Sequence, residues 1–313
     1  MSSHIDLSII IPVTERSADD VKALYFEYKK NVENSGKSYE FIYVLDGPLP
    51  SVLEQLQALR ESGEQIKIIK LAKWFGEATA LSVGFENSSG ETIVTLPAYQ
   101  QIDAKDIPRL INALEDKDMV VARRWPRIDS AFNKLQSKVF NSLLRQISDL
   151  DANDVGCGAR VFRRRVIDEV HIYGDQHRFL AMLAHRSGFK VIQIDVAQSQ
   201  QDTHQRIYPA GTYLRRLLDF LTIFFLIKFT KKPLRFFGLL GSGIFTVGFL
   251  STLYLIATRV LGDATLADRP ALMISVLFIV LGIQVLAIGL VGEIVIFTHA
   301  KEIKEYTVEE IIN

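Results

Sequence analysis

Leu7-Ser-Ile-Ile-Ile-Pro-Val13 is the stretch that decides the fold of the first two thirds of the chain. It is short, apolar and rich in β-branched residues, with a proline near its end, which is typical of a buried first strand. Similar runs predict further strands at 39–45, 66–71, 91–96, 119–122 and 190–196. Helical periodicity predicts helices at 17–34, with Ser17 as N-cap, and at 52–62, 77–87, 106–114 and 179–187.

Strands that alternate with helices predict a parallel sheet with helices on both faces. Ligands of such sheets bind at the carboxyl ends of the strands. The segments that follow the predicted strands are therefore the candidate site, namely 13–16, 46–48, 73–77, 97–101 and 123–127. Beyond residue 121 the pattern changes to an amphipathic helix at 130–148, a small-residue turn at 154–160 and a polar loop at 198–209.

Two long apolar runs, 236–257 and 271–297, occupy the last third of the chain. Each exceeds the roughly 18 to 20 residues that a helix needs to cross a hydrocarbon core. Because neither run carries an internal charge before Glu293, two membrane spans are favoured over two buried helices. Basic residues precede the first span and follow the second, which predicts that both termini lie on the cytoplasmic side of the cell membrane.

These patterns predict four parts. Residues 1–210 form a cytoplasmic domain, 211–235 an interface helix with a basic collar, 236–298 a two-span hairpin, and 299–313 a cytoplasmic tail. No basic segment followed by an apolar one opens the chain, so no signal peptide is expected. The two spans do not decide whether the protein self-associates into a homo-oligomer.

Composition excludes several classes of protein. The 313 residues carry 36 basic and 36 acidic side chains, so net charge gives no reason to expect a nucleic-acid partner. The single cysteine, Cys157, excludes an intramolecular disulfide and a cysteine-based zinc site. No Walker A loop, Gly-rich dinucleotide turn or Ser-His-Asp order is present.

Several pieces of the chain, taken in order, resemble the polyprenyl-phosphate branch of the family 2 glycosyltransferases, the dolichyl-phosphate mannose synthase type. They are Ser8-Ile-Ile-Ile-Pro-Val, Val44-Leu-Asp46-Gly47, Phe75-Gly76, Asp154-Val-Gly-Cys-Gly-Ala-Arg160, 206–213, and 229–235 before two spans. The resemblance implies an α/β fold of GT-A type, a Rossmann-like mixed sheet with helices on both faces. It also implies inverting transfer of a sugar from a nucleotide sugar to a polyprenyl phosphate, undecaprenyl or dolichyl, at the cytoplasmic face of the membrane.

The resemblance also assigns roles to residues. It places the nucleotide on Asp46, the phosphates on Arg206, the acceptor phosphate on Arg123 and Arg127, and Asp154 near the acceptor. Other donor-side candidates are Pro12, Thr14, Glu15, Gly76, Glu77, Tyr99 and Gln101, and the lipid-side candidates are Lys134, Tyr213, Lys231, Lys232 and Arg235. Arginine suits these roles because its planar fork matches phosphate oxygens. The alternative is that the arginines are solvated charges and that Asp46 only forms an Asp-Gly turn.

The chain departs from the family at the metal motif, Asp-any-Asp followed by a glutamine. Pro97 and Tyr99 stand at the two aspartate positions, and only Gln101 remains. Mg²⁺ or Mn²⁺ is the implied cofactor, but these ions prefer carboxylate oxygens, so no metal ligand is assigned. A metal-independent or altered-donor transferase, in which arginine or lysine neutralises the diphosphate, is preferred. Two alternatives stay open: Glu77 or Glu15 rebuilds a metal site, or the protein is a non-catalytic lipid-phosphate-binding scaffold.

Overall fold

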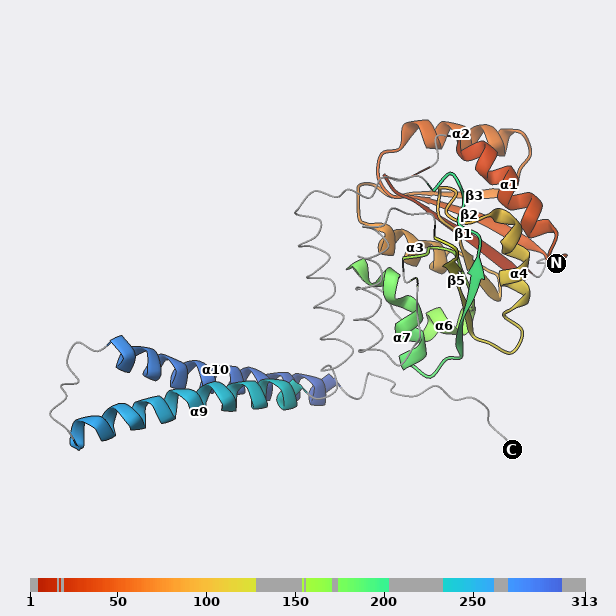
Figure 1. Ribbon diagram of the computed structural model, residues 1–313. Helices are drawn as coiled ribbons and strands as arrows, with labels where there is room; N and C mark the ends of the chain where they lie inside the picture. The colour runs from red at the N-terminus through yellow and green to blue at the C-terminus, as the bar shows by residue number, and fades with distance from the viewer. Residues whose placement is uncertain are drawn as a thin grey trace. The chain divides into compact units, whose positions relative to one another are not determined.

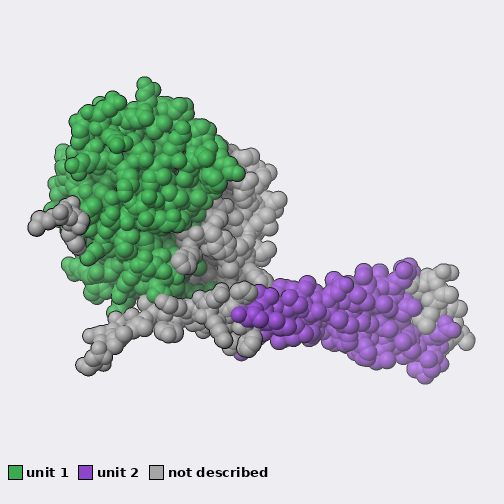
Figure 2. All heavy atoms as spheres, turned by 180° about the vertical axis from the view of Figure 1, so that it is seen from behind, with its two compact units in different colours: residues 1–215, 306–313 green, residues 216–305 purple. Residues whose placement is uncertain are grey.

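The computed structural model describes residues 5–15, 17, 20–127, 154, 156–170, 174–202, 233–261 and 270–299. The chain divides into two compact units, coloured separately in Figure 2. One comprises Met1–Arg215 with Tyr306–Asn313, and the other comprises Arg216–Glu305.

The first unit is built on a seven-stranded sheet with the order β3-β2-β1-β4-β6-β5-β7 (Figure 1). Its strands are β1 (Leu7–Val13), β2 (Tyr39–Leu45), β3 (Ile66–Lys70), β4 (Thr92–Thr95), β5 (Met119–Arg124), β6 (Arg160–Arg163) and β7 (Val191–Val196). All of them run parallel except β6, which is antiparallel to both β4 and β5. The sheet is therefore mixed, as the resemblance implied, and strand–helix alternation had predicted only its parallel part.

Helices cover both faces of this sheet (Figure 1). They are α1 (Val21–Glu33), α2 (Pro50–Glu61), α3 (Glu77–Glu86), α4 (Ile107–Asn112), α6 (Arg164–Glu169) and α7 (Leu180–Arg186), with 3-10 turns η1 (Ala104–Asp106) and η2 (Gly174–Phe179). Side chains of a strand alternate between its two faces. Accordingly Ile9 packs in the core beneath α1, α2 and α4, whereas its neighbour Ile10 packs in the core beneath α3, α6 and α7.

Two boundaries and one strand differ from the prediction in ways that affect the site. The first helix begins at Val21, and its N-cap is Asp20 rather than Ser17, because the Asp20 carboxylate accepts the Ala23 N–H at 2.8 Å. Strand β5 continues to Arg124, so two arginines expected after the strand lie on it. Strand β6 was not predicted, since Arg-Val-Phe-Arg has too few apolar residues. The helix expected at 130–148 lies outside the described residues.

The second unit is a pair of packed helices, α9 (Pro233–Val260) and α10 (Pro270–His299). Both are long and apolar enough to cross a membrane, with mean hydropathies of 1.8 and 2.8 over their apolar windows. Glycines let the two backbones approach closely: a Cβ at Gly282 would lie 2.5 Å from Phe245 N, and one at Gly241 would lie 2.7 Å from Gly282 O. The two predicted apolar runs lie inside these helices.

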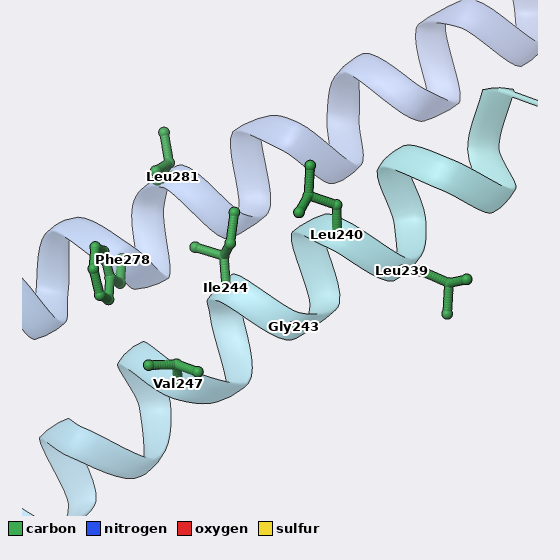
Figure 3. Close-up of a pocket in the computed structure, with 7 residues that line it drawn as sticks. All are labelled: Leu239, Leu240, Gly243, Ile244, Val247, Phe278 and Leu281. Carbon is green, nitrogen blue, oxygen red and sulfur yellow. The ribbon is translucent and has the colours of Figure 1, made fainter. Parts of the chain in front are cut away.

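Two further features belong to this helix pair. Glu293, the charge within the second apolar run, accepts a long hydrogen bond of 3.4 Å from Leu234 N in the first turn of α9. The N–H groups of a first helical turn have no partner inside the helix, so this contact caps α9. An apolar groove of about 400 Å³ also runs along the pair (Figure 3), lined by Leu239, Leu240, Gly243, Ile244, Val247, Phe278 and Leu281.

Candidate active site at the carboxyl edge of the sheet

The parallel strands end at one edge of the sheet, and the antiparallel β6 begins there. This geometry brings together Asp46 after β2, the Pro97–Gln101 segment after β4, Arg124 at the end of β5 and the turn before β6. The edge therefore collects most of the described candidates that the sequence indicated.

A buried ion cluster centred on Arg124 ties three chain segments together at this edge. Its guanidinium is 1% exposed and forms a two-pronged pair with Asp154, with Nε to Oδ2 at 2.7 Å and NH2 to Oδ1 at 2.8 Å. Its NH1 group donates to Asp202 Oδ2 at 3.1 Å, and this oxygen also accepts from Gln198 Nε2 at 2.8 Å. Two-pronged arginine–carboxylate pairs fix orientation as well as charge.

Charge in this cluster keeps Asp154 ionised. Burial works to raise the pKa of Asp154, but the paired Arg124 and the nearby charge of Arg127 hold the pKa below its usual range. Arg127 NH1 lies 3.9 Å from Asp154 Oδ1. The structure thus brings two sequence candidates, Asp154 and Arg127, together through Arg124.

Arg123 occupies different surroundings from its neighbour in β5. Its guanidinium pairs with the carboxylate of Asp195 in β7, with NH2 to Oδ2 at 2.6 Å, and it lies 5.7 Å from the ring centroid of Trp125. The charge of Arg123 lowers the pKa of Asp195. Arg123 therefore lies on the other face of β5 from the Arg124 cluster.

Asp46 is buried and anchors the turn that leads into α3. Its two carboxylate oxygens accept the N–H groups of Phe75 at 2.7 Å and of Gly76 at 2.9 Å. The next residue, Gly47, has a φ of +95°, and a Cβ there would lie 2.5 Å from the ring of Trp74. Asp46 and Gly47 thus hold the 74–76 turn against the end of β2.

Hydrogen bonds fix the segment that replaces the metal motif. The buried hydroxyl of Tyr28 lies 3.1 Å from Pro97 O and 3.2 Å from Tyr99 O. Gln101 Oε1 accepts Gly158 N–H at 2.7 Å, while Gln101 Nε2 donates to the Tyr99 hydroxyl at 2.9 Å. The segment is tied on one side to α1 and on the other to the turn before β6.

A histidine–carboxylate contact closes the edge beside α3. His177 Nε2 lies 3.3 Å from a carboxylate oxygen of Glu77, and buried Arg160 donates to His177 O at 2.9 Å. Burial works to raise the pKa of Glu77, but His177, Arg160 and Arg178 lower it to about 2. Glu77 is therefore an ionised carboxylate in a positive environment.

The other candidates are placed as follows. Pro12 is buried in β1, Thr14 is half-buried after it, and Glu15 is exposed. Arg235 is exposed in the first turn of α9. Lys134, Arg206, Tyr213, Lys231 and Lys232 lie outside the described residues.

Sequence reasoning missed three contributors to the edge: Arg124 as the centre of the cluster, Asp202 and Tyr28. Strand alternation could have separated Arg124 from Arg123, had β5 been extended by two residues. Asp202 and Tyr28 gave no signal, because each acts through a contact with a residue far away in the sequence.

The family model described as Glycosyl transferase family 2 matches residues 8–171, which contain β1 to β6 and most of this edge. The chain belongs to glycosyl transferase family 2. It is 30% identical to the undecaprenyl-phosphate 4-deoxy-4-formamido-L-arabinose transferase of Proteus mirabilis over 312 residues, which cover 98% of this chain and 94% of the relative. The transferase of the same name from Aeromonas hydrophila is 27% identical over 98% of this chain and 94% of its own length.

Solved structures confirm the GT-A-like fold of this family 2 glycosyltransferase. Glucosyl-3-phosphoglycerate synthase from Mycobacterium tuberculosis, with Mn²⁺, uridine diphosphate and phosphoglyceric acid, superposes with a TM-score of 0.50 at 13% identity. It covers 70% of this chain and 78% of its own. A mycobacterial protein gives a TM-score of 0.51 at 14% identity, over 70% of this chain and 74% of its own.

The described residues of the edge do not fit Mg²⁺ or Mn²⁺. These ions take oxygen ligands, usually one or two carboxylates together with substrate phosphates. Pro97 and Tyr99 bring no carboxylate, and Gln101 Oε1 already accepts a backbone N–H. No cluster of three or more Asp, Glu, His or Cys side chains occurs within the described ranges.

Proposed function

We propose that this chain transfers a sugar from a nucleotide sugar to a polyprenyl phosphate, of the undecaprenyl or dolichyl kind, at the cytoplasmic face of a membrane. The supporting observation is the extent of the similarity to undecaprenyl-phosphate transferases. It covers 98% of this chain, and so includes both the sheet with its carboxyl edge and the two long apolar helices. Similarity limited to the sheet would not indicate which acceptor receives the sugar.

The chemistry at the edge follows from the acceptor. A phosphate oxygen of the lipid attacks the anomeric carbon, the bond from that carbon to the diphosphate breaks, and the nucleoside diphosphate leaves with the electron pair. The attacking oxygen is already anionic, so the site must position and desolvate it rather than deprotonate it. Arg127 is the described residue best suited to hold that phosphate, and Asp154, fixed by Arg124, orients Arg127.

The nucleotide belongs at the ends of β1, β2 and β4. Asp46 contributes there mainly by fixing the 74–76 turn, because both of its oxygens accept backbone N–H groups. Thr14 and Tyr99, both half-buried at this edge, are the described side chains proposed to contact the donor. Arg206 is proposed to meet the phosphates, as the resemblance implies.

The two apolar helices are proposed to form a membrane-spanning hairpin with both termini in the cytoplasm. Arg235 lies in the first turn of α9, and with the lysines before it forms the basic collar that would hold an anionic head group near the membrane surface. Residues 1–210 then form the cytoplasmic catalytic domain. Pairing of hairpins in a homo-oligomer would place two active sites on one membrane patch.

Transfer in reconstituted vesicles tests this function. The full-length protein is mixed with undecaprenyl phosphate and a panel of labelled nucleotide sugars, and the label is followed into the lipid phase. One donor is expected to label the lipid, and Arg127→Ala is expected to reduce that transfer strongly, whereas Arg109→Ala, a change at an exposed arginine of α4, should leave it unchanged. Lack of transfer from every donor would refute the proposal.

A further inference from the structure

We propose that the donor site of this chain works without a divalent cation. Oxygens at this edge of the sheet already accept hydrogen bonds, and arginines at the same edge are held in place by their contacts. This inference rests on the proposed transfer from a nucleotide sugar. It explains the missing Asp-any-Asp motif by a donor site that functions with different residues, and not by a site that has lost its function.

Two buried carboxylates at this edge already accept hydrogen bonds on both of their oxygens. Asp46 and Asp154 are both 2% exposed, and each uses both of its oxygens. Asp46 accepts two backbone N–H groups, and Asp154 accepts the fork of Arg124. A cation could recruit either carboxylate only by breaking buried hydrogen bonds to charged oxygens, which are the strong ones.

Hydrogen bonds also hold the neutral oxygens of the same segment in place, with the single Tyr28 proton shared between two carbonyls. Pro97 O and Tyr99 O lie within hydrogen-bond distance of the Tyr28 hydroxyl, and Gln101 Oε1 accepts Gly158 N–H. The buried Tyr28 has its pKa raised by burial, so its hydroxyl remains a neutral donor. Random loss of the motif would not preserve hydrogen bonds that connect α1, the segment after β4 and the turn before β6.

Positive charge is present at the same edge of the sheet. Arg160 pairs in register with Thr95, two residues before Pro97, and its guanidinium is buried. Arg127 lies beside Asp154 at the same edge. Glu77, one of the two alternative metal ligands, already contacts His177 and lies near the charges of Arg160 and Arg178. Arginines at this edge can neutralise part of the charge of a diphosphate without a cation.

Binding of uridine diphosphate and guanosine diphosphate to the full-length protein, with EDTA or with Mn²⁺, tests this inference. Calorimetry gives the nucleotide affinity, and the electron paramagnetic resonance signal of Mn²⁺ gives metal binding directly. The affinity of the wild type is expected to change by less than about threefold between the two conditions. Tyr99→Asp adds one carboxylate, which together with diphosphate oxygens can hold Mn²⁺, so this variant is expected to bind nucleotide at least about tenfold more tightly with Mn²⁺.

Tyr99→Asn is the matched control, because it has the shape of the aspartate variant without its charge, and it should show no response to Mn²⁺. A wild-type affinity that falls tenfold or more in EDTA, about 1.4 kcal/mol, would overturn the inference and leave the proposed transfer standing. If neither nucleotide binds under any condition, the proposed function fails. In that case the inference fails with it, because a site that binds no nucleotide is not a donor site.

Discussion

Arg123 and Arg124 are adjacent residues whose surroundings predict opposite effects on stability. Arg124 is buried between Asp154 and Asp202, so Arg124→Ala leaves two buried carboxylates without their cation and should cost about 3–5 kcal/mol. Arg123 pairs with Asp195 where both side chains are about a third or more exposed, so Arg123→Ala should cost about 0–1 kcal/mol. Denaturant unfolding of both variants measures the difference, and equal losses would contradict the geometry.

Glu77 predicts a dependence of stability on acid pH. Its folded-state pKa of about 2 lies below the usual value of 4.5, so the ionised carboxylate stabilises the fold above about pH 5, and this contribution is lost as pH falls to 2. Because the side chain is partly exposed, the contribution is about 1 kcal/mol, or about 2–4 °C in Tm. Glu77→Gln should therefore lower Tm at neutral pH and make progressively less difference as pH falls to 2. Glu54→Gln, on the exposed side of α2, is the control and should leave Tm unchanged at both neutral and acid pH. A Tm difference between Glu77→Gln and wild type that stays constant across pH would exclude this account.

Single residues also mark the limit of prediction from the sequence. The sequence indicated that Asp46, Gln101 and Arg127 lie at one edge, because strand ends can be located from apolar runs. Asp154 was placed near the acceptor only by the family resemblance. The sequence could not tell that Asp46 anchors the 74–76 turn or that Arg123 pairs with Asp195, since those partners are 29 or more residues away. The sequence also did not show that Arg124 is buried and Arg123 is not, because the predicted strand ended at residue 122 and β5 continues to Arg124.

Among the elements, the α9–α10 pair depends on its glycines. A Cβ at Gly282 would lie 2.5 Å from a backbone atom of α9, whereas one at Gly243 would meet nothing within 4 Å. Gly282→Leu should therefore separate the helices, and Gly243→Leu is the matched control. Disulfide formation between Thr252→Cys and Ser275→Cys, whose hydroxyls lie 3.0 Å apart, reports their separation. Equal cross-linking in the two leucine variants would contradict the packing.

Elements were predicted unequally well for a physical reason. Strands β1 to β5 and β7 were expected, because buried strands need long apolar or β-branched runs. Strand β6 lies between two other strands yet has arginines at both ends, which are held by buried contacts such as Arg160 to His177 O. Tertiary contacts therefore override its weak sequence pattern.

At the scale of the whole molecule, the order of motifs indicated a family 2 glycosyltransferase, and the family match confirmed it. The sequence alone left a non-catalytic scaffold open, because the metal motif is missing. Relatives that match over nearly the whole chain favour the enzyme, and the ordered network around Pro97–Gln101 gives that segment a structural role. The number of spans and the orientation of the termini stay predictions.

The identity of both products tests the central claim most directly. Vesicles that contain the full-length protein, undecaprenyl phosphate and the active nucleotide sugar are analysed by mass spectrometry for the lipid and by chromatography for the released nucleotide. The account predicts a sugar linked to the lipid through one phosphate, with an equal amount of nucleoside diphosphate released. A lipid carrying two phosphates with nucleoside monophosphate released, or no modified lipid at all, would contradict it.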